Sequence, residues 1–127
     1  LRLRANLGRE ISILADIMVK HAVPPQGVSL EAAARDVWSR GRADGVVVTG
    51  AETGSPVSKT ELGRVRNALP PEAKIWVGSG AGPDNIGPLL SMADGIIVGS
   101  ALREGGLAGA PLDPRRIDAF MTRLGRG

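Results

Sequence analysis

Reactive and ligand-binding side chains gather at four points of the sequence, each at the end of a short apolar stretch. The first point holds Lys20 and His21, which follow the apolar residues 11–19. A lysine can form a Schiff base, neutralise a phosphate or polarise a carbonyl, and a histidine exchanges protons near neutral pH. Successive strand residues point to opposite sides, so one of the two is expected in a site and the other can pack outside it.

The second point closes the apolar residues 45–49 and runs on to residue 54. Threonine hydroxyls and flexible glycines suit a polar substrate or a phosphate, and the residues concerned are Thr49, Gly50, Thr53 and Gly54. The alternative is a loop whose glycines serve only the turn.

The third and fourth points favour an anion. Gly78-Ser79-Gly80 follows the apolar residues 74–78, and Gly99-Ser100 follows 95–99, with Arg103 available as a cation. Glycines let a ligand approach the backbone, and a helix expected over 83–92 would offer free N–H groups at its start. The alternative is again a purely structural turn.

Asp16 lies inside the first apolar stretch, four residues before Lys20. This even spacing places both on the same side of a strand, where an ion pair would shift the lysine pKa. The commoner fate of a lone strand carboxylate is to be satisfied by hydrogen bonds within the fold.

The elements that must position these residues alternate regularly. Unbroken apolar runs predict buried strands, and capped amphipathic stretches predict helices, in the order strand 11–19, helix 29–41, strand 45–49, helix 58–69, strand 74–78, helix 83–92, strand 95–99 and helix 113–124. Ser58 and Glu61 have the spacing of a capping box. This alternation predicts a parallel sheet, in a (β/α)8 barrel or an open doubly wound fold, with ligands at the carboxyl ends of its strands.

The number of units favours half of a barrel. Four strand–helix units make half of a (β/α)8 barrel, and residues 1–8 read as the last turns of a preceding helix. We therefore expect residues 1–127 to form a single partial domain, the C-terminal half of a (β/α)8 TIM barrel, in a fragment of a longer chain. Such a half leaves open edges at 11–19 and 95–99, so it should dimerise, aggregate or belong to a longer protein.

A weak internal repeat links the second and fourth strands. Residues 43–54 and 93–106 both begin Ala-Asp-Gly, continue with β-branched residues and end in a glycine-rich stretch. We expect the Asp-Gly pair to end the preceding helix and turn the chain into the strand.

Composition excludes several classes of protein. There is no cysteine and one histidine, which excludes disulfides, thiolate metal sites and histidine-rich metal sites, and nothing identifies a cofactor. No apolar run is long enough for a transmembrane segment and no signal peptide is visible, so we predict a cytoplasmic protein. The net charge of +3 is spread along the chain and aromatic residues are 2%, which disfavours a nucleic-acid partner.

Four motifs in order resemble the BtpA family: ADIMVKHAVPP, ADGVVVTGAETGSPVS, VGSGAGPDNI and ADGIIVGSALREGG. The likeness runs from Leu1 to Phe120 and implies a barrel about twice this length, homo-oligomeric when complete. It implies Lys20 and His21 as catalytic residues, and a set of phosphate- or ligand-binding residues: Thr49, Gly50, Thr53, Gly54, Gly78, Ser79, Gly80, Asn85, Gly99 and Ser100. The family often has lysine where Arg103 stands, so Arg103 is expected to contact charge and not to act as a nucleophile.

The resemblance leaves two functions open. The first is an enzyme acting on a phosphorylated small molecule, held by the loops after the last two strands. The second is a non-catalytic factor for photosystem I biogenesis, with peripheral association to the photosynthetic membrane. The family also includes SgcQ-like bacterial members.

Overall fold

The computed structural model describes residues 2–7, 11–18, 26–50 and 57–125. Four strands form one sheet in the order β1-β2-β3-β4, and every neighbouring pair is parallel. The strands are β1 (Leu14–Asp16), β2 (Gly45–Val48), β3 (Lys74–Val77) and β4 (Gly95–Ile96). The predicted strands are confirmed, and the two edge strands are shorter than expected because each pairs with a neighbour on one side only.

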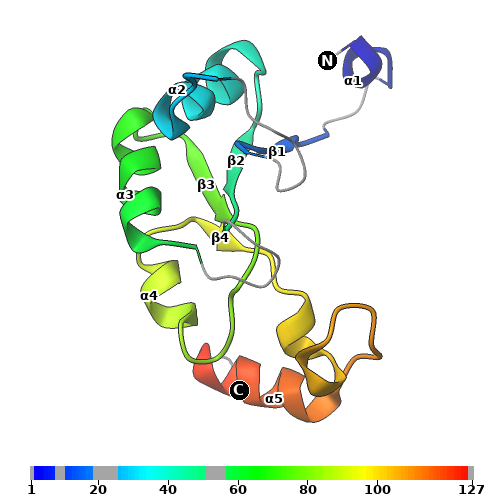
Figure 1. Ribbon diagram of the computed structural model, residues 1–127. Helices are drawn as coiled ribbons and strands as arrows, with labels where there is room; N and C mark the ends of the chain where they lie inside the picture. Colours follow the sequence, from blue (N-terminus) through cyan, green and yellow to red (C-terminus); the bar gives the residue numbers. More distant parts are fainter. Residues whose placement is uncertain (1, 8–10, 19–25, 51–56, 126–127) are drawn as a thin grey trace.

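The helices follow the predicted alternation (Figure 1). They are α1 (Arg2–Leu7), α2 (Leu30–Arg35), α3 (Lys59–Ala68), α4 (Ile86–Leu90) and α5 (Pro114–Arg123). A π-helical turn over Asp36–Arg40 extends α2, and two 3₁₀ turns, Ser100–Leu102 and Glu104–Gly106, precede α5.

The helix caps follow the sequence in two of three cases. The Ser29 hydroxyl accepts a hydrogen bond from Ala32 N at 3.2 Å, and Asp113 accepts one from Arg115 N at 3.0 Å. Ser58 stands at the N-cap of α3 but its side chain makes no capping hydrogen bond. The capping-box prediction for Ser58 is therefore wrong.

The hydrophobic core lies between one face of the sheet and the helices. Alternate strand residues Val46, Val48, Ile75 and Val77 are buried against apolar side chains of the helices, including Ala34, Leu62, Val65 and Leu89. Figure 1 shows α2, α3 and α4 along this side of the sheet. Two neighbouring helices are also joined by an ion pair. The guanidinium of Arg64 on α3 donates two hydrogen bonds, of 2.6 and 3.0 Å, to the carboxylate of Glu31 on α2. These bonds lower the pKa of Glu31 to about 2.

The opposite face of the sheet, here called the inner face, carries Leu14, Val47, Trp76 and Ile97. A Cβ atom on Gly95 would lie 2.6 Å from Cε3 of the Trp76 indole, and one on Gly45 would lie 3.3 Å from its Cδ1. The Trp76 ring therefore occupies space left by a glycine on each neighbouring strand. Leu14 and Ile97, at the two edges, keep 42% and 46% of their surface exposed.

The repeated Ala-Asp-Gly sequence forms the same contact twice. Asp44 N donates to Ile13 O at 2.9 Å and its carboxylate accepts from Ile13 N at 2.8 Å. Asp94 N donates to Ile75 O at 2.8 Å and its carboxylate accepts from Ile75 N at 2.9 Å. Beyond the predicted turn, each aspartate thus joins the start of its strand to the strand before it.

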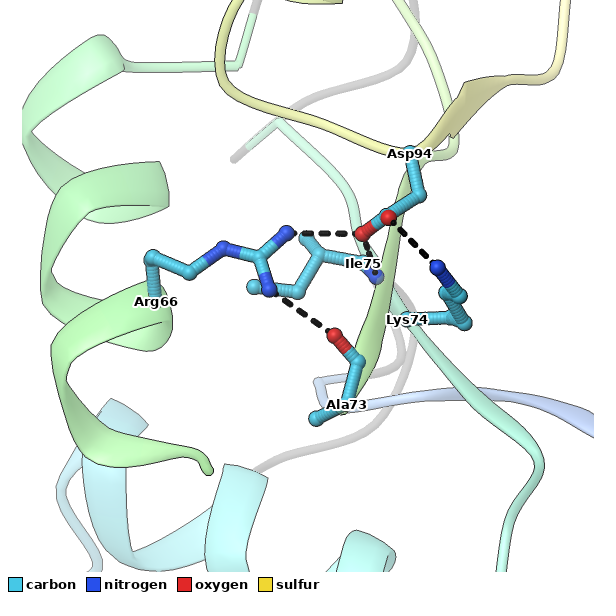
Figure 2. Close-up of polar contacts among 5 residues, drawn as sticks. All are labelled: Arg66, Ala73, Lys74, Ile75 and Asp94. Atoms are coloured by element: carbon cyan, nitrogen blue, oxygen red, sulfur yellow. Dashed lines mark hydrogen bonds and ion pairs between the residues drawn. The ribbon is translucent and has the colours of Figure 1, made fainter. Parts of the chain in front are cut away.

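Asp94 also gathers two cations (Figure 2). Its carboxylate lies 2.7 Å from Arg66 Nη2 and 3.1 Å from Lys74 Nζ, while Arg66 Nη1 donates to Ala73 O at 2.8 Å. The hydrogen bond from Ile75 N and then the Arg66 guanidinium hold the pKa of Asp94 at about 2, below its ordinary 3.8. This cluster fixes the amino ends of β3 and β4, opposite the end where barrels bind ligands.

We predict that Asp94 makes the protein acid-sensitive. Because its pKa is lowered on folding, its contribution to stability is complete above about pH 4 and is lost as the pH falls toward 2. Asp94→Asn should lower the free energy of unfolding at pH 7 by roughly 1 kcal/mol, allowing for solvent screening. Urea unfolding at pH 7 and pH 3 measures this, and the difference between variant and wild type should shrink at pH 3. Asp118→Asn, an exposed carboxylate on α5, is the matched control, and equal losses in both variants would contradict the prediction.

Candidate functional site

Three of the predicted site residues meet where β2 and β3 end. The Ser79 hydroxyl accepts a hydrogen bond from Gly50 N at 3.3 Å, which joins the exits of the two strands. The Thr49 hydroxyl donates to Met18 O at 3.3 Å, which joins the exit of β2 to the end of β1. The parallel sheet thus brings Thr49, Gly50 and Ser79 together at its carboxyl edge, as the sequence predicts.

Gly78 is explained by packing before any ligand is considered. A Cβ atom there would lie 2.5 Å from Val47 Cγ1 and 2.6 Å from Thr49 Cγ2, both on stiff β-branched side chains. The glycine therefore allows β3 to lie beside β2 on the inner face. Its predicted role in ligand binding stays a prediction.

Asn85 shapes the loop between β3 and α4. Its Oδ1 accepts from Gly82 N at 2.8 Å and its Nδ2 donates to Gly80 O at 2.8 Å. Gly80 has a φ of +67°, a left-handed conformation that favours glycine. The predicted helix start at residue 83 is wrong, because a turn closed by Asn85 precedes α4 and occupies the N–H of Gly82.

The exit of β4 has free space beside Gly99, followed by a loop that is closed by its own hydrogen bonds. A Cβ atom on Gly99 would meet nothing within 4 Å, and Ser100 begins the first 3₁₀ turn. The Arg103 guanidinium donates to Ala110 O, and the backbone of the next residue, Glu104 N, bonds to Pro111 O at 3.0 Å. Arg103 therefore closes the loop over 103–112, and its predicted contact with a phosphate is a separate, untested role.

Four predicted site residues lie outside the described residues: Lys20, His21, Thr53 and Gly54. Within the described ranges, no group of three or more histidine, aspartate or glutamate residues could hold a metal ion. In that same part of the chain, no helix is both long and apolar enough to cross a membrane.

A pocket of about 400 Å³ lies at the other end of the sheet. Its lining includes Arg66, Asn67, Ser91 and Asp94. Arg66 is already bound to Asp94 and to Ala73 O, so this pocket belongs to the structural cluster at the amino ends of the strands. Sequence reasoning did not predict that cluster, although the repeated Ala-Asp-Gly was the signal that pointed to Asp94.

The fold and the strand-exit residues define a class of protein: four parallel strand–helix units of a (β/α)8 barrel. A crystal structure of phosphoribosyl anthranilate isomerase from Thermus thermophilus, a TIM barrel, superimposes on 95% of the chain and on 54% of its own, with a TM-score of 0.64 and 15% identity. A likeness at this identity concerns the fold alone. It confirms the prediction of half a barrel.

The chain belongs to the BtpA family, whose model matches residues 1–126. It is 40% identical over 127 residues to the photosystem I biogenesis protein BtpA of Synechocystis, covering 100% of this chain and 44% of that protein. It is 44% identical over 104 residues to an uncharacterized protein of Pyrococcus abyssi, covering 82% and 39%. An uncharacterized mitochondrial protein of Caenorhabditis elegans is 38% identical, with 98% of this chain and 44% of that protein covered. The chain thus spans less than half the length of these relatives.

We predict that Asn85 stabilises the loop through both ends of its amide. Asn85→Ala should lower the free energy of unfolding by about 1–2 kcal/mol, since two hydrogen bonds are lost. Asn85→Asp keeps an acceptor for Gly82 N and loses the donor to Gly80 O, so its loss should be smaller. Thermal unfolding measures all three proteins, with Asn67→Ala on the exposed side of α3 as control. A loss for Asn85→Ala no larger than the control would contradict this role.

Proposed function

We propose that this chain forms the part of a BtpA-family barrel that binds the phosphate group of a small molecule, at the exits of β3 and β4. The observation that carries the proposal is the hydrogen bond between the Ser79 hydroxyl and Gly50 N, 3.3 Å long. It draws small polar residues from the exits of β2 and β3 together at the carboxyl edge of the sheet, and β4 is the next strand beside β3. In (β/α)8 barrels the loops after the last two strands often build a phosphate site.

The groups available there suit an anion. Ser79 and Ser100 offer hydroxyl groups that can donate to phosphate oxygens, and Gly99 has open space where a side chain would stand. Gly78 adds little weight, because packing against Val47 and Thr49 already requires a glycine. The proposal therefore depends mainly on Ser79, Gly99 and Ser100.

We assign the chemistry to the exit of β1. Lys20 would polarise a carbonyl or neutralise charge near the phosphate, and His21 would take up or release a proton. The Thr49–Met18 hydrogen bond ties the end of β1, the strand that precedes these residues in the sequence, to the exit of β2. Thr53 and Gly54 complete the set of residues after β2 that we propose as ligand-binding.

A second candidate function is non-catalytic help in photosystem I biogenesis. The observation favouring it is the 40% identity to the Synechocystis protein of that name over the whole chain. Against it, the 38% identity to a protein of an animal, Caenorhabditis elegans, is nearly as high. Binding of a small phosphorylated molecule, in the cytoplasm or at a membrane surface, is compatible with both relatives. It is also compatible with the SgcQ-like bacterial members of the family.

A thermal-shift measurement tests the anion site. Inorganic phosphate and phosphorylated sugars should raise the melting temperature of the purified chain by ~5 °C at saturating concentration, and unphosphorylated sugars should not. Ser79→Asp and Ser100→Asp should abolish the shift by charge repulsion. Ser91→Asp, at the end of α4 and in the opposite pocket, is the matched control and should retain it. A shift that survives Ser79→Asp and Ser100→Asp would contradict the site.

A chimaera separates the two functions. This chain would replace the corresponding 44% of the Synechocystis protein, with and without Lys20→Ala, and photosystem I content would be measured. If chemistry at Lys20 underlies the role, the variant should lose most of the photosystem I content that the parent chimaera restores. Equal restoration by both chimaeras would favour a non-catalytic factor and contradict the catalytic assignment.

A further inference from the structure

The first 3₁₀ turn, Ser100–Leu102, here called the Ser100 turn, is held at its carbonyl end by residues outside it. Each of its three backbone carbonyl oxygens accepts a hydrogen bond from a residue further along the chain. The bonds run from Arg103 N to Ser100 O at 3.0 Å, from Arg116 Nη1 to Ala101 O at 3.2 Å, and from Asp113 N to Leu102 O at 2.9 Å. Two of the three donors belong to the start of α5, which lies beside this turn (Figure 1).

Asp113 fixes the start of α5 next to the Ser100 turn. Its carboxylate accepts a hydrogen bond from Arg115 N at 3.0 Å and so caps the helix, and Pro114 takes the first helical position. The same carboxylate lies 3.9 Å from Arg116 Nε. A 3₁₀ turn of three residues has poor hydrogen-bond geometry of its own, so its conformation depends on what holds it from outside. The capped start of α5 provides this support.

The guanidinium of Arg116 lies in space left by a glycine. A Cβ atom on Gly106, which has a φ of +71°, would lie 3.6 Å from Arg116 Nη1. The guanidinium therefore lies against both 3₁₀ turns and joins them to α5. Arg103 acts elsewhere, because its guanidinium donates to Ala110 O within the loop over 103–112.

We propose that Arg116 is a positioning residue of the phosphate site: by bonding to Ala101 O, it holds the Ser100 turn in the orientation in which Ser100 binds phosphate. This role rests on the proposed function, in which Ser100 donates to a phosphate oxygen. Ser100 begins the turn and the guanidinium bonds to a carbonyl oxygen of the turn, so Arg116 acts through the backbone and not on the anion itself. A turn already held in place loses less conformational freedom when phosphate binds, which raises the affinity.

Titration calorimetry with inorganic phosphate tests this role in the purified protein. Arg116→Met removes the bond to Ala101 O and should weaken phosphate binding about fivefold, the effect of one lost hydrogen bond. Arg115→Met is the matched control, because it removes the same charge from the neighbouring exposed residue of α5, and it should leave the affinity nearly unchanged. Arg116→Lys keeps a cationic donor for Ala101 O and should recover most of the lost affinity.

A double-mutant cycle shows whether Arg116 acts through Ser100. Ser100→Ala removes the hydroxyl group and should weaken phosphate binding by itself. Arg116→Met added to Ser100→Ala should cause little further loss, because the group that Arg116 positions is already absent. Thermal unfolding without phosphate checks that every variant is folded at the temperature of the titration, which separates lost affinity from lost stability.

The outcomes distinguish the phosphate site from the role of Arg116. Absence of phosphate binding by the wild-type protein would refute the proposed function and the role of Arg116 with it. If the wild type binds phosphate and Arg116→Met binds it as tightly as Arg115→Met, the site stands and the role of Arg116 is refuted. Equal losses from Arg116→Met with and without the Ser100 hydroxyl would also refute that role, since Arg116 would then act on the anion by its charge. So would an Arg116→Lys variant as weak as Arg116→Met.

Discussion

Burial of alternate residues of β2 and β3 against the helices is the constraint on which the rest of the structure depends. Because Val46, Val48, Ile75 and Val77 face α2 and α3, the residues between them must face the other way. That requirement places Val47, Trp76 and Gly78 on the inner face. It also brings the residues that follow both strands to one edge of the sheet, where Ser79 meets Gly50.

The order of elements could be predicted because it depends on local patterns that tertiary structure did not override. Apolar runs gave the strands, and Ser29 and Asp113 marked helix starts correctly. Ser58 failed because a serine in the right place need not turn its hydroxyl toward the helix. The predicted lengths of the two edge strands were wrong because a strand ends where its pairing with a neighbour ends. Among the described elements, the strands predicted over 11–19 and 95–99 have one neighbouring strand each.

Only those contacts of the candidate site that follow from the parallel direction of the strands could be predicted from the sequence. That Thr49, Gly50 and Ser79 meet follows from the shared direction of the strands. That Asn85 closes the loop before α4, and that Arg103 binds a carbonyl of its own loop, depends on loop paths that residue types do not specify. Gly78 shows the limit most clearly, since the same glycine serves close packing and would also serve a ligand.

Asp44 and Asp94 divide the sheet into two pairs of strands. Each makes the same pair of bonds to the residue opposite it on the preceding strand, one between β1 and β2 and the other between β3 and β4. The identical device therefore recurs every second strand and is absent between β2 and β3, where Ala73 precedes the strand. Loss of either aspartate should therefore loosen one pair of strands, β1–β2 or β3–β4, and leave the contact between β2 and β3 in place. The sheet is in this respect two clamped pairs of strands joined by backbone pairing and core packing.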